Sequence, residues 1–274
     1  MNRSAALLVA SVVIMAWACS QVALTGRSQL LLISDAQMAQ LARQSRTQFL
    51  QQADREKRIV RPTDSEQSAK LLPAVTRAAD RIIEAAGLRS RAQWRVFVIR
   101  TSQINANASA DGTIVVYTGI LPIAKTEAGL AAVLGHEVAH VVARHSAERL
   151  SQQLLAQNIT NVAVAATDPK YQRTVAAALG LGGQYGILLP FSREHESEAD
   201  HLGLYYMAKA GYDPADAPAF WQRMAAAGGS APPEFMSTHP SHATRIAQLQ
   251  RWLPDARRYF EDRTLPLPTT LGKE

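Results

Sequence analysis

The sequence predicts an α+β protein that is mainly helical, with one small β-sheet packed against a long central helix. Two observations support this class. Apolar residues recur at helical spacing through most of the chain, and only two short runs, 94–99 and 113–118, are rich in the β-branched and aromatic residues typical of strands. Hydrophobic residues make up 47% of the 274 residues, which is enough for a folded core and too apolar for a disordered chain.

Capping residues and glycines mark where the expected helices begin and end. Ser34 with Gln37 forms a capping-box pattern, which opens a helix, and Gly87 is a natural C-terminal stop. Asp111 and Gly112 form a turn signal directly before the second strand. The expected helices are 35–58, one ending at Gly87, 127–157, one beginning near Arg193, one opened by Asp213 and Pro214 that runs through Met224, and 241–253.

Residues 1–18 have the pattern of a secretory signal peptide: Arg3 supplies a positive charge, and 5–18 is uncharged and mostly apolar. This stretch is too short for a typical transmembrane helix. Residues 16–18 would serve ordinary signal peptidase, but together with Cys19 they also resemble a bacterial lipobox, in which the cysteine is lipidated. We favour lipidation, because the only cysteine of the chain lies directly after the expected cleavage bond.

The chain is basic, with a formal net charge of +6, which could indicate nucleic acid or an anionic membrane surface as a partner. The basic residues are scattered, however, and no run of Lys and Arg is interleaved with aromatic residues. We therefore expect no nucleic-acid partner. With a single cysteine, the chain cannot form an internal disulfide.

The strongest chemical signal is His136-Glu137-Val138-Ala139-His140, inside the longest expected helix. Residues four apart share a helix face, so both imidazoles can reach one metal ion, and zinc accepts neutral imidazole nitrogens. Glu137 is placed to act on a water molecule as general base. By helical phase, His145 and Glu148 should point away from this site and lie on the surface.

A catalytic zinc needs a third protein ligand, and the segment 193–200 concentrates acidic groups in an expected helix. One of its carboxylates should be that ligand, and Asp200 could orient a metal-bound histidine by accepting a hydrogen bond. The residue pattern alone leaves Glu194, Glu196 and Glu198 open. His195 and His242 are more plausible as structural histidines than as ligands.

The HExxH motif followed about 55 residues later by Glu196-Ser197-Glu198-Ala199-Asp200 resembles the gluzincin metallopeptidases that include the CAAX-prenyl protease and HtpX. The resemblance implies a zincin-like catalytic domain with its small sheet packed on the HExxH helix. It implies one Zn²⁺ per chain, with His136, His140 and Glu196 as ligands and Asp200 as the supporting acceptor.

Two further elements resemble parts of that family. Asn105, Ala106, Asn107 and Ala108, followed by 113–119, are similar to the edge strand that pairs with substrate backbone. Thr238-His239-Pro240, with Arg245 further on, is similar to a later element near the zinc. The resemblance implies that His239 stabilises the oxyanion or fills the open metal position in a latent state, and that Arg245 supports the site.

The expected organisation is a signal peptide (1–18), a tether (19–33), a metallopeptidase domain (34–254) and an extended, proline-containing tail (255–274). Within the domain, 175–191 is uncharged and glycine-rich, which favours a loop. Because this loop immediately precedes the helix of Glu196, it could gate the site together with His239.

The branch that the chain resembles most is the soluble, exported one, like the outer-membrane lipoprotein protease LoiP. That resemblance implies hydrolysis of unfolded or misassembled cell-envelope proteins in the bacterial periplasm, with Cys19 anchoring the protein to the outer membrane and the outer-membrane assembly machinery as a partner. The alternative is a chaperone or scaffold for outer-membrane assembly whose zinc site is latent. Glu137 favours the enzyme, because a pure scaffold needs no general base.

Overall fold

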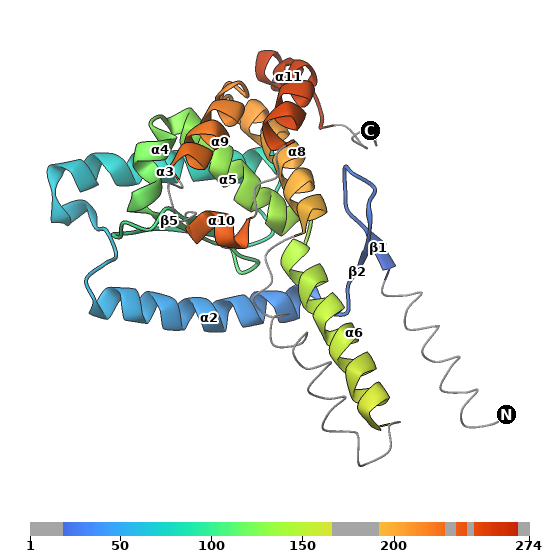
Figure 1. Ribbon diagram of the computed structural model, residues 1–274. Helices are drawn as coiled ribbons and strands as arrows, with labels where there is room; N and C mark the ends of the chain where they lie inside the picture. Colours follow the sequence, from blue (N-terminus) through green and yellow to red (C-terminus); the bar gives the residue numbers. More distant parts are fainter. Residues whose placement is uncertain (1–18, 166–191, 228–233, 240–243, 268–274) are drawn as a thin grey trace. The chain divides into compact units, whose positions relative to one another are not determined.

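The computed structural model describes residues 19–165, 192–227, 234–239 and 244–267. These residues form two compact units. The smaller unit contains 19–34 and 144–165, and the larger one contains the remaining described residues. Helices dominate and the strands are short, so the predicted fold class is confirmed (Figure 1). None of the described helices is both long enough and apolar enough to cross a membrane.

The smaller unit is a β-hairpin packed on one helix. Strands β1 (Cys19–Gln21) and β2 (Ser28–Leu30) pair antiparallel, and α6 covers His145–Ala165. Arg27 donates hydrogen bonds of 2.9 and 2.7 Å to the Glu148 carboxylate, and the Leu32 N–H donates to Ser151 Oγ at 2.8 Å. The prediction that His145 and Glu148 lie on the surface is wrong, because both are buried.

That error has a structural cause, since the single helix expected over 127–157 is two helices. Helix α5 (Glu127–Val142) ends before Arg144, whose φ of 57° lies in the left-handed region, and α6 begins at His145. The break changes the helical phase, so residues after it no longer follow the face assigned from the HExxH motif. Helix α6 also groups with the N-terminal hairpin, although the sequence placed it inside the catalytic domain.

The larger unit contains a three-stranded sheet in the order β3-β5-β4. Strand β3 (Arg95–Ile99) is parallel to β5 (Thr113–Tyr117), and β4 (Ala106–Ala108) is antiparallel to β5. Every residue of β5 is buried, as expected for a central strand covered on both faces. Strand β4 lies at an edge of this sheet.

One face of the sheet is covered by α2 (Asp35–Arg55), which begins where the capping-box pattern predicted. Its inward side chains Phe49, Leu50 and Ala53 pack against Ile99, Val115 and Tyr117. Residues 97 and 99 and their partners 115 and 117 share this face because side chains alternate along a strand.

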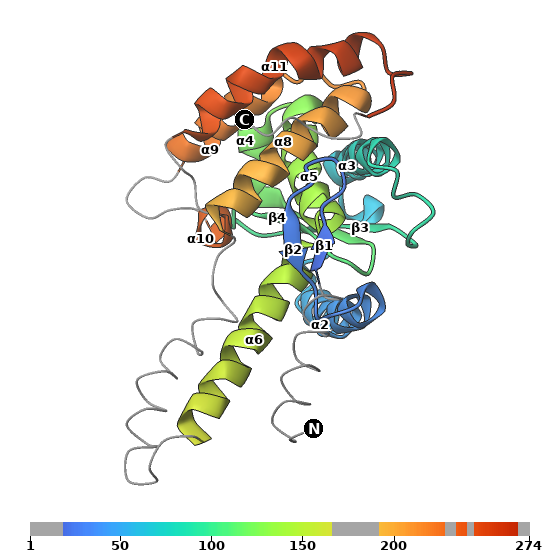
Figure 2. The ribbon, with the colours of Figure 1, turned by 90° about the vertical axis from the view of Figure 1, so that its right-hand side faces the viewer.

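The opposite side carries the helices that build the site (Figure 2). Helix α5 is central: it is buried from Gly129 to His140 and contacts α3 and β4 as well as α8 and α9. The remaining described helices of the larger unit are η1 (Pro62–Asp64), α3 (Glu66–Ala85), η2 (Thr118–Ile120), α4 (Leu121–Ala124), α8 (Arg193–Lys209), α9 (Asp216–Ala226), α10 (Glu234–Thr238) and α11 (Arg245–Glu261).

Helices α5 and α8 approach each other through two glycines. A Cβ atom added to Gly135 would lie 2.7 Å from the Gly203 carbonyl oxygen, and one added to Gly203 would lie 2.7 Å from the His136 backbone nitrogen. Both distances are shorter than van der Waals contact, so larger residues would separate the helices. This close crossing places the ligand residues of the two helices opposite each other.

Several helix boundaries differ from the predictions. Helix α2 ends at Arg55 instead of residue 58, and α11 begins at Arg245 instead of residue 241. The helix expected to open at Asp213 and Pro214 begins at Asp216, because Asp213 instead forms a turn that accepts a 2.9 Å hydrogen bond from the Ala215 N–H. The tail predicted to be extended from residue 255 is helical through Glu261. Pro254 lies inside α11, and buried Ala256 and Tyr259 hold the following turns in place.

Candidate metal centre

His136 and His140 lie four residues apart on α5, and their Nε2 atoms are 3.1 Å apart. Both side chains are buried, and their rings meet edge to face with centroids 4.7 Å apart. The helical spacing therefore brings the two imidazoles to one point, as the sequence predicted.

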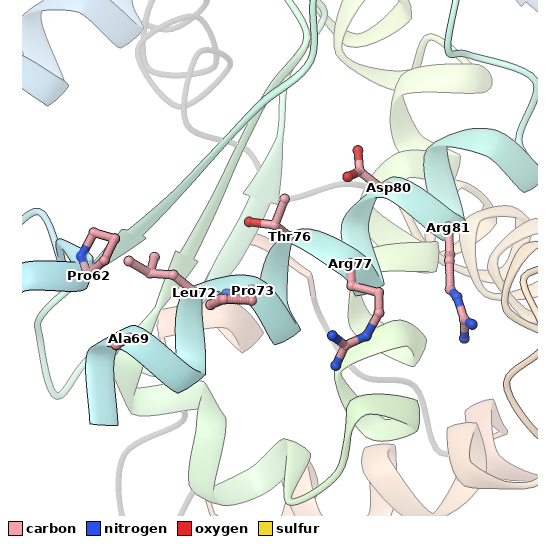
Figure 3. A pocket seen from close by; sticks show the side chains of 8 residues that line it. All are labelled: Pro62, Ala69, Leu72, Pro73, Thr76, Arg77, Asp80 and Arg81. Carbon is pink, nitrogen blue, oxygen red and sulfur yellow. The ribbon is translucent and has the colours of Figure 1, made fainter. Parts of the chain in front are cut away.

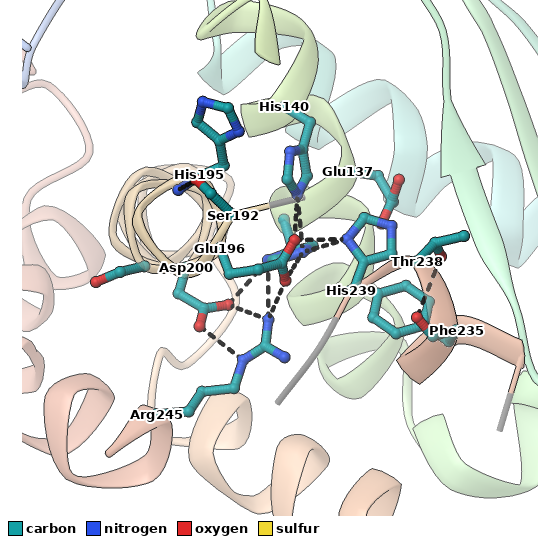
Figure 4. Close-up of polar contacts among 12 residues, drawn as sticks. Glu137, His140, Ser192, His195, Glu196, Asp200, Phe235, Thr238, His239 and Arg245 are labelled. Atoms are coloured by element: carbon teal, nitrogen blue, oxygen red, sulfur yellow. Dashed lines mark hydrogen bonds and ion pairs between the residues drawn. The ribbon is translucent and has the colours of Figure 1, made fainter. Parts of the chain in front are cut away.

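Helix α8 brings Glu196 to the same point (Figure 4). Its Oε2 atom lies 3.4 Å from His136 Nε2, and its Oε1 atom lies 3.4 Å from His140 Nε2. Ser192 caps this helix by accepting a 3.1 Å hydrogen bond from the His195 N–H. Of the other two candidates, Glu194 is exposed and Glu198 is buried outside the cluster.

A fourth donor comes from His239, immediately after α10. Its Nδ1 atom lies 3.3 Å from His136 Nε2 and 3.0 Å from Glu196 Oε1. The ring stacks on Phe235 with centroids 4.3 Å apart. One ligand atom from each of His136, His140, Glu196 and His239 lies within 4.8 Å of the other three.

The spacing of these four atoms fits a zinc ion. Two nitrogens bound tetrahedrally to one zinc at its usual bond length lie about 3.3 Å apart. The donor separations of 3.0 to 3.4 Å, counting both oxygens of Glu196, have this size. Two or three imidazoles with one carboxylate are also the donor types that zinc binds. The residues present therefore fit the metal that the motif implies.

Asp200 and Arg245 support the cluster from behind. Asp200 Oδ1 lies 2.8 Å from His136 Nδ1, which leaves Nε2 of that ring free to face the other ligands. Arg245 donates to both Asp200 oxygens at 2.6 and 2.8 Å and to Glu196 Oε2 at 3.2 Å. Its guanidinium stacks 3.6 Å above the ring centroid of Trp221 and is only 2% exposed.

The electrostatics favour a positive charge at this point. Burial lowers the pKa of His136, but the carboxylates of Glu196 and Asp200 outweigh burial and raise this pKa to about 9. Although Glu196 is buried, His136, His140 and His239 hold its pKa well below the usual range. Burial also acts to raise the pKa of Asp200, but Arg245 and His136 outweigh burial and lower this pKa. A cluster that stabilises protonated imidazole is also suited to a metal cation.

Glu137 lies beside the four donors without joining them. Its side chain is buried, and its Oε1 atom has no hydrogen-bond partner among the described residues. That oxygen lies 3.6 Å from His239 Nε2. Burial raises the pKa of Glu137, while a hydrogen bond with the Ala108 backbone acts in the opposite direction. An unpartnered, buried carboxylate oxygen is costly unless another group uses it.

The structure also adds residues that sequence reasoning missed. Trp221 and Phe235 pack on Arg245 and His239, and neither has a local signal that separates it from an ordinary core aromatic residue. His195 is buried outside the ligand cluster, whereas His242 and 175–191 lie outside the described residues. A hollow along α3, lined by residues such as Leu72, shares no residue with the cluster (Figure 3).

Comparison with known proteins agrees with this geometry. Residues 70–253 match the model of peptidase family M48. The chain belongs to this family. The predicted gluzincin resemblance and the predicted enzyme class, a metallopeptidase, are therefore confirmed, while its placement in an exported, LoiP-like branch stays a prediction.

Three similar proteins illustrate the range of M48 relatives. The mitochondrial metalloendopeptidase OMA1 of Schizosaccharomyces pombe is 41% identical over 208 residues, covering 70% of this chain and 58% of that protein. The protein of the same name from Arabidopsis thaliana is 40% identical over 152 residues, covering 56% and 30%. The beta-barrel assembly-enhancing protease of Escherichia coli K12 is 31% identical over 163 residues, covering 56% and 33%. The chain thus spans about a third to somewhat over half of these relatives.

Proposed function

We propose that this M48 peptidase is a zinc-dependent endopeptidase, with one ion per chain, that hydrolyses unfolded or misassembled proteins of the cell envelope. The observation that carries the proposal is the cluster of His136, His140, Glu196 and His239 with Glu137 buried at its side. A structural site closed by four protein ligands has no use for a further buried carboxylate. A hydrolytic site has one, because water must lose a proton as it attacks.

In this proposal each residue has a distinct task. His136, His140 and Glu196 would hold a zinc ion, which would supply Lewis-acid chemistry at the scissile carbonyl and at the attacking water. Glu137 accepts the proton of the attacking water and passes it to the leaving amine; burial raises its pKa, which suits it to both steps. Asp200 orients His136, and Arg245 holds Asp200.

Substrate binding is assigned to the strand over 105–108. Asn105 and Ser109 pair with β5, so by the alternation of an antiparallel ladder the backbone groups of Ala106 and Ala108 point to the open edge. An extended polypeptide could pair with this edge through its main chain, close to Glu137. Such pairing recognises backbone more than sequence, which suits a substrate class defined by being unfolded.

A second candidate function is a chaperone or scaffold with a latent metal site. The position of His239 favours such a resting state, because its Nδ1 atom occupies the fourth corner of the donor cluster. In the working enzyme His239 would leave that corner, and its ring could then stabilise the oxyanion. The two candidates therefore differ in whether His239 is released in the presence of a polypeptide.

Location in the bacterial periplasm, with lipidated Cys19 at the outer membrane, completes the proposal. It rests on the signal-like residues 1–18 and on the name of the Escherichia coli relative, which points to β-barrel assembly as a related process. Ser20 is compatible with outer-membrane sorting. Labelling with a fatty-acid probe should mark the wild-type protein and not Cys19→Ser, and equal labelling of both would contradict this location.

The decisive experiment compares cleavage of casein and of an unfolded porin by the purified mature protein, with and without a chelator. Cleavage that stops on chelation and is absent in Glu137→Gln supports the enzyme. A wild-type protein that binds zinc and prevents porin aggregation, yet cleaves neither substrate, supports the scaffold.

A further inference from the structure

We propose that Arg46 of α2 is a positioning residue for this reaction, because it holds β4 in the register that presents its open edge to the substrate. This inference rests on the proposed function, in which β4 is the strand that pairs with the substrate. Arg46 does not touch the four metal-binding candidates; it acts from the opposite face of the sheet.

Arg46 contacts β4 and the residue just after it. Its Nη2 atom donates a 2.7 Å hydrogen bond to Asn107 Oδ1 and lies 3.3 Å from Ser109 Oγ. Asn107 and Ser109 are two residues apart, so both side chains face α2. One guanidinium therefore forms hydrogen bonds with two neighbouring side chains on the same face of the strand.

The other side of the strand faces the site. Tyr117 N–H donates to the Asn105 carbonyl at 3.1 Å, and Ser109 N–H donates to the Thr113 carbonyl at 3.0 Å. The odd-numbered residues are thus paired with β5, which turns the backbone groups of Ala106 and Ala108 to the edge of β4 that has no strand partner. Ala106 is buried at this edge, and β4 contacts α5. Ala108 also forms a backbone hydrogen bond with Glu137. The edge proposed to bind substrate therefore lies directly beside the proposed general base, which α5 holds in place.

The pairing register of β4 with β5 is fixed by few interactions within the sheet. Strand β4 has three residues and a single strand neighbour, and a slip by one residue would turn every side chain to the wrong face. Such a slip would replace Asn107 by an alanine under Arg46 and would remove both hydrogen bonds. The hydrogen bonds of the Arg46 guanidinium therefore stabilise the observed register relative to the slipped one.

Arg46 is an unusual residue for that position. It is half-buried, its cation lies 5.7 Å from the ring centroid of Phe49, and its buried Nε atom has no hydrogen-bond partner among the described residues. Burial lowers its pKa, and the attraction of Asp111 only partly compensates. An apolar side chain at this position could pack against Phe49 without the free-energy cost of burying a charge. What the guanidinium adds is its hydrogen bonds to Asn107 and Ser109.

This contact also lies outside the residues that match the M48 family model. The match to family M48 begins at residue 70, whereas Arg46 lies on α2 at 35–55. Through Arg46, this N-terminal helix would support substrate binding as well as cover one face of the sheet.

The test compares Arg46→Met with Arg43→Met, a matched change on the exposed face of the same helix. With an unfolded polypeptide substrate, Arg46→Met should raise KM by about tenfold, the ratio expected for a lost charged hydrogen bond, with kcat and zinc content unchanged. Arg46→Lys should restore part of the affinity, because an ammonium can replace one of the two contacts. Asn107→Ala removes the same bond from the strand side, so the test does not depend on Arg46→Met folding.

A second readout does not need activity. Amide hydrogen exchange at Ser109 and Tyr117, whose N–H groups donate across the pair of β4 and β5, should be faster in Arg46→Met than in Arg43→Met, while exchange in β3 stays equal. If KM and exchange in Arg46→Met and Asn107→Ala match those of Arg43→Met within twofold, the inference is wrong. If the wild type shows no peptidase activity, the proposed function fails, and exchange alone then decides whether Arg46 holds the strand.

Discussion

Asp200 Oδ1 lies 2.8 Å from His136 Nδ1, and this contact joins the two helices that carry the candidate metal ligands. The carboxylate favours the tautomer with hydrogen on Nδ1, which leaves the Nε2 lone pair for an ion. Asp200 is itself held by Arg245, so the orientation of one imidazole depends on a chain of three side chains.

We expect Asp200→Asn to weaken zinc binding by about 10- to 100-fold, the usual cost of losing such a supporting carboxylate. The amide oxygen can still accept from Nδ1, but it carries no charge to balance Arg245. Competition titration with a chelator measures the affinity. Asp80→Asn, which changes an exposed carboxylate on α3, is the control and should bind zinc like the wild type.

We expect Glu137→Gln to keep zinc and to lose turnover by about 100- to 10,000-fold, because the amide preserves the shape of the site but cannot accept a proton. Elemental analysis and a peptide-cleavage assay on the same sample separate the two effects. Near-normal hydrolysis at full zinc occupancy would remove Glu137 from the mechanism.

We expect His239→Ala to bind a metal through the three remaining ligands while its coordination changes. The wild-type site has four protein donors in contact, and the variant has three. With Co²⁺ in place of zinc, the visible absorption spectrum reports the ligand set, so the two proteins should differ. Identical spectra would mean that His239 is not a ligand in the resting protein.

We expect Gly203→Ala to lower the free energy of unfolding by about 1–3 kcal/mol and to weaken zinc binding. Its new methyl group would meet the His136 backbone nitrogen at 2.7 Å, which forces α5 and α8 apart. Chemical denaturation and metal titration measure the two effects. Gly87→Ala is a useful contrast, because its Cβ meets nothing within 4 Å and its cost should come only from its positive φ.

A surface pair provides a prediction on pH. Arg77 lies 2.6 Å from Glu127, and this hydrogen-bonded ion pair lowers the pKa of Glu127 below its usual 4.5. A carboxyl group with a lowered pKa in the folded state adds stability above the unfolded pKa and loses it as pH falls through the folded pKa. Arg77→Met should therefore lower the free energy of unfolding slightly at pH 7, because solvent screens this exposed pair. That difference should shrink as the pH falls below 4.5 and vanish below the lowered pKa of Glu127 in the folded state; a cost independent of pH would assign it to packing.

The sequence predicts the local parts of this molecule well. Ser34 correctly marks the start of α2, and Gly87 the end of α3, where its φ is 67°. The HExxH spacing brings two imidazoles together because a helix has a regular repeat. The residue pattern left three glutamates open in 193–200, and the resemblance selected Glu196, the one that lies in the cluster.

The remaining features depend on contacts that no local pattern contains. Arg144 takes a left-handed conformation that costs about 1–2 kcal/mol for a residue with a side chain, so only the surrounding fold can impose it. Trp221 and Phe235 are distant in sequence from the residues that they cover. The hydrogen bond between Arg46 and Asn107 joins a helix to a strand 61 positions away in the sequence. No charged residue on that strand indicates the contact.

Asp200 and Arg245 reach His136 across 64 and 109 positions of the chain. Contacts of this range close only after the intervening elements have docked, because each long loop must give up its conformational freedom first. Metal uptake is therefore linked to completion of the fold, and chelation should act on the folding equilibrium as well as on the reaction. A partly folded copy of this chain would hold neither an ion nor the chemistry proposed for it, so its own topology would withhold the proposed activity until folding is complete.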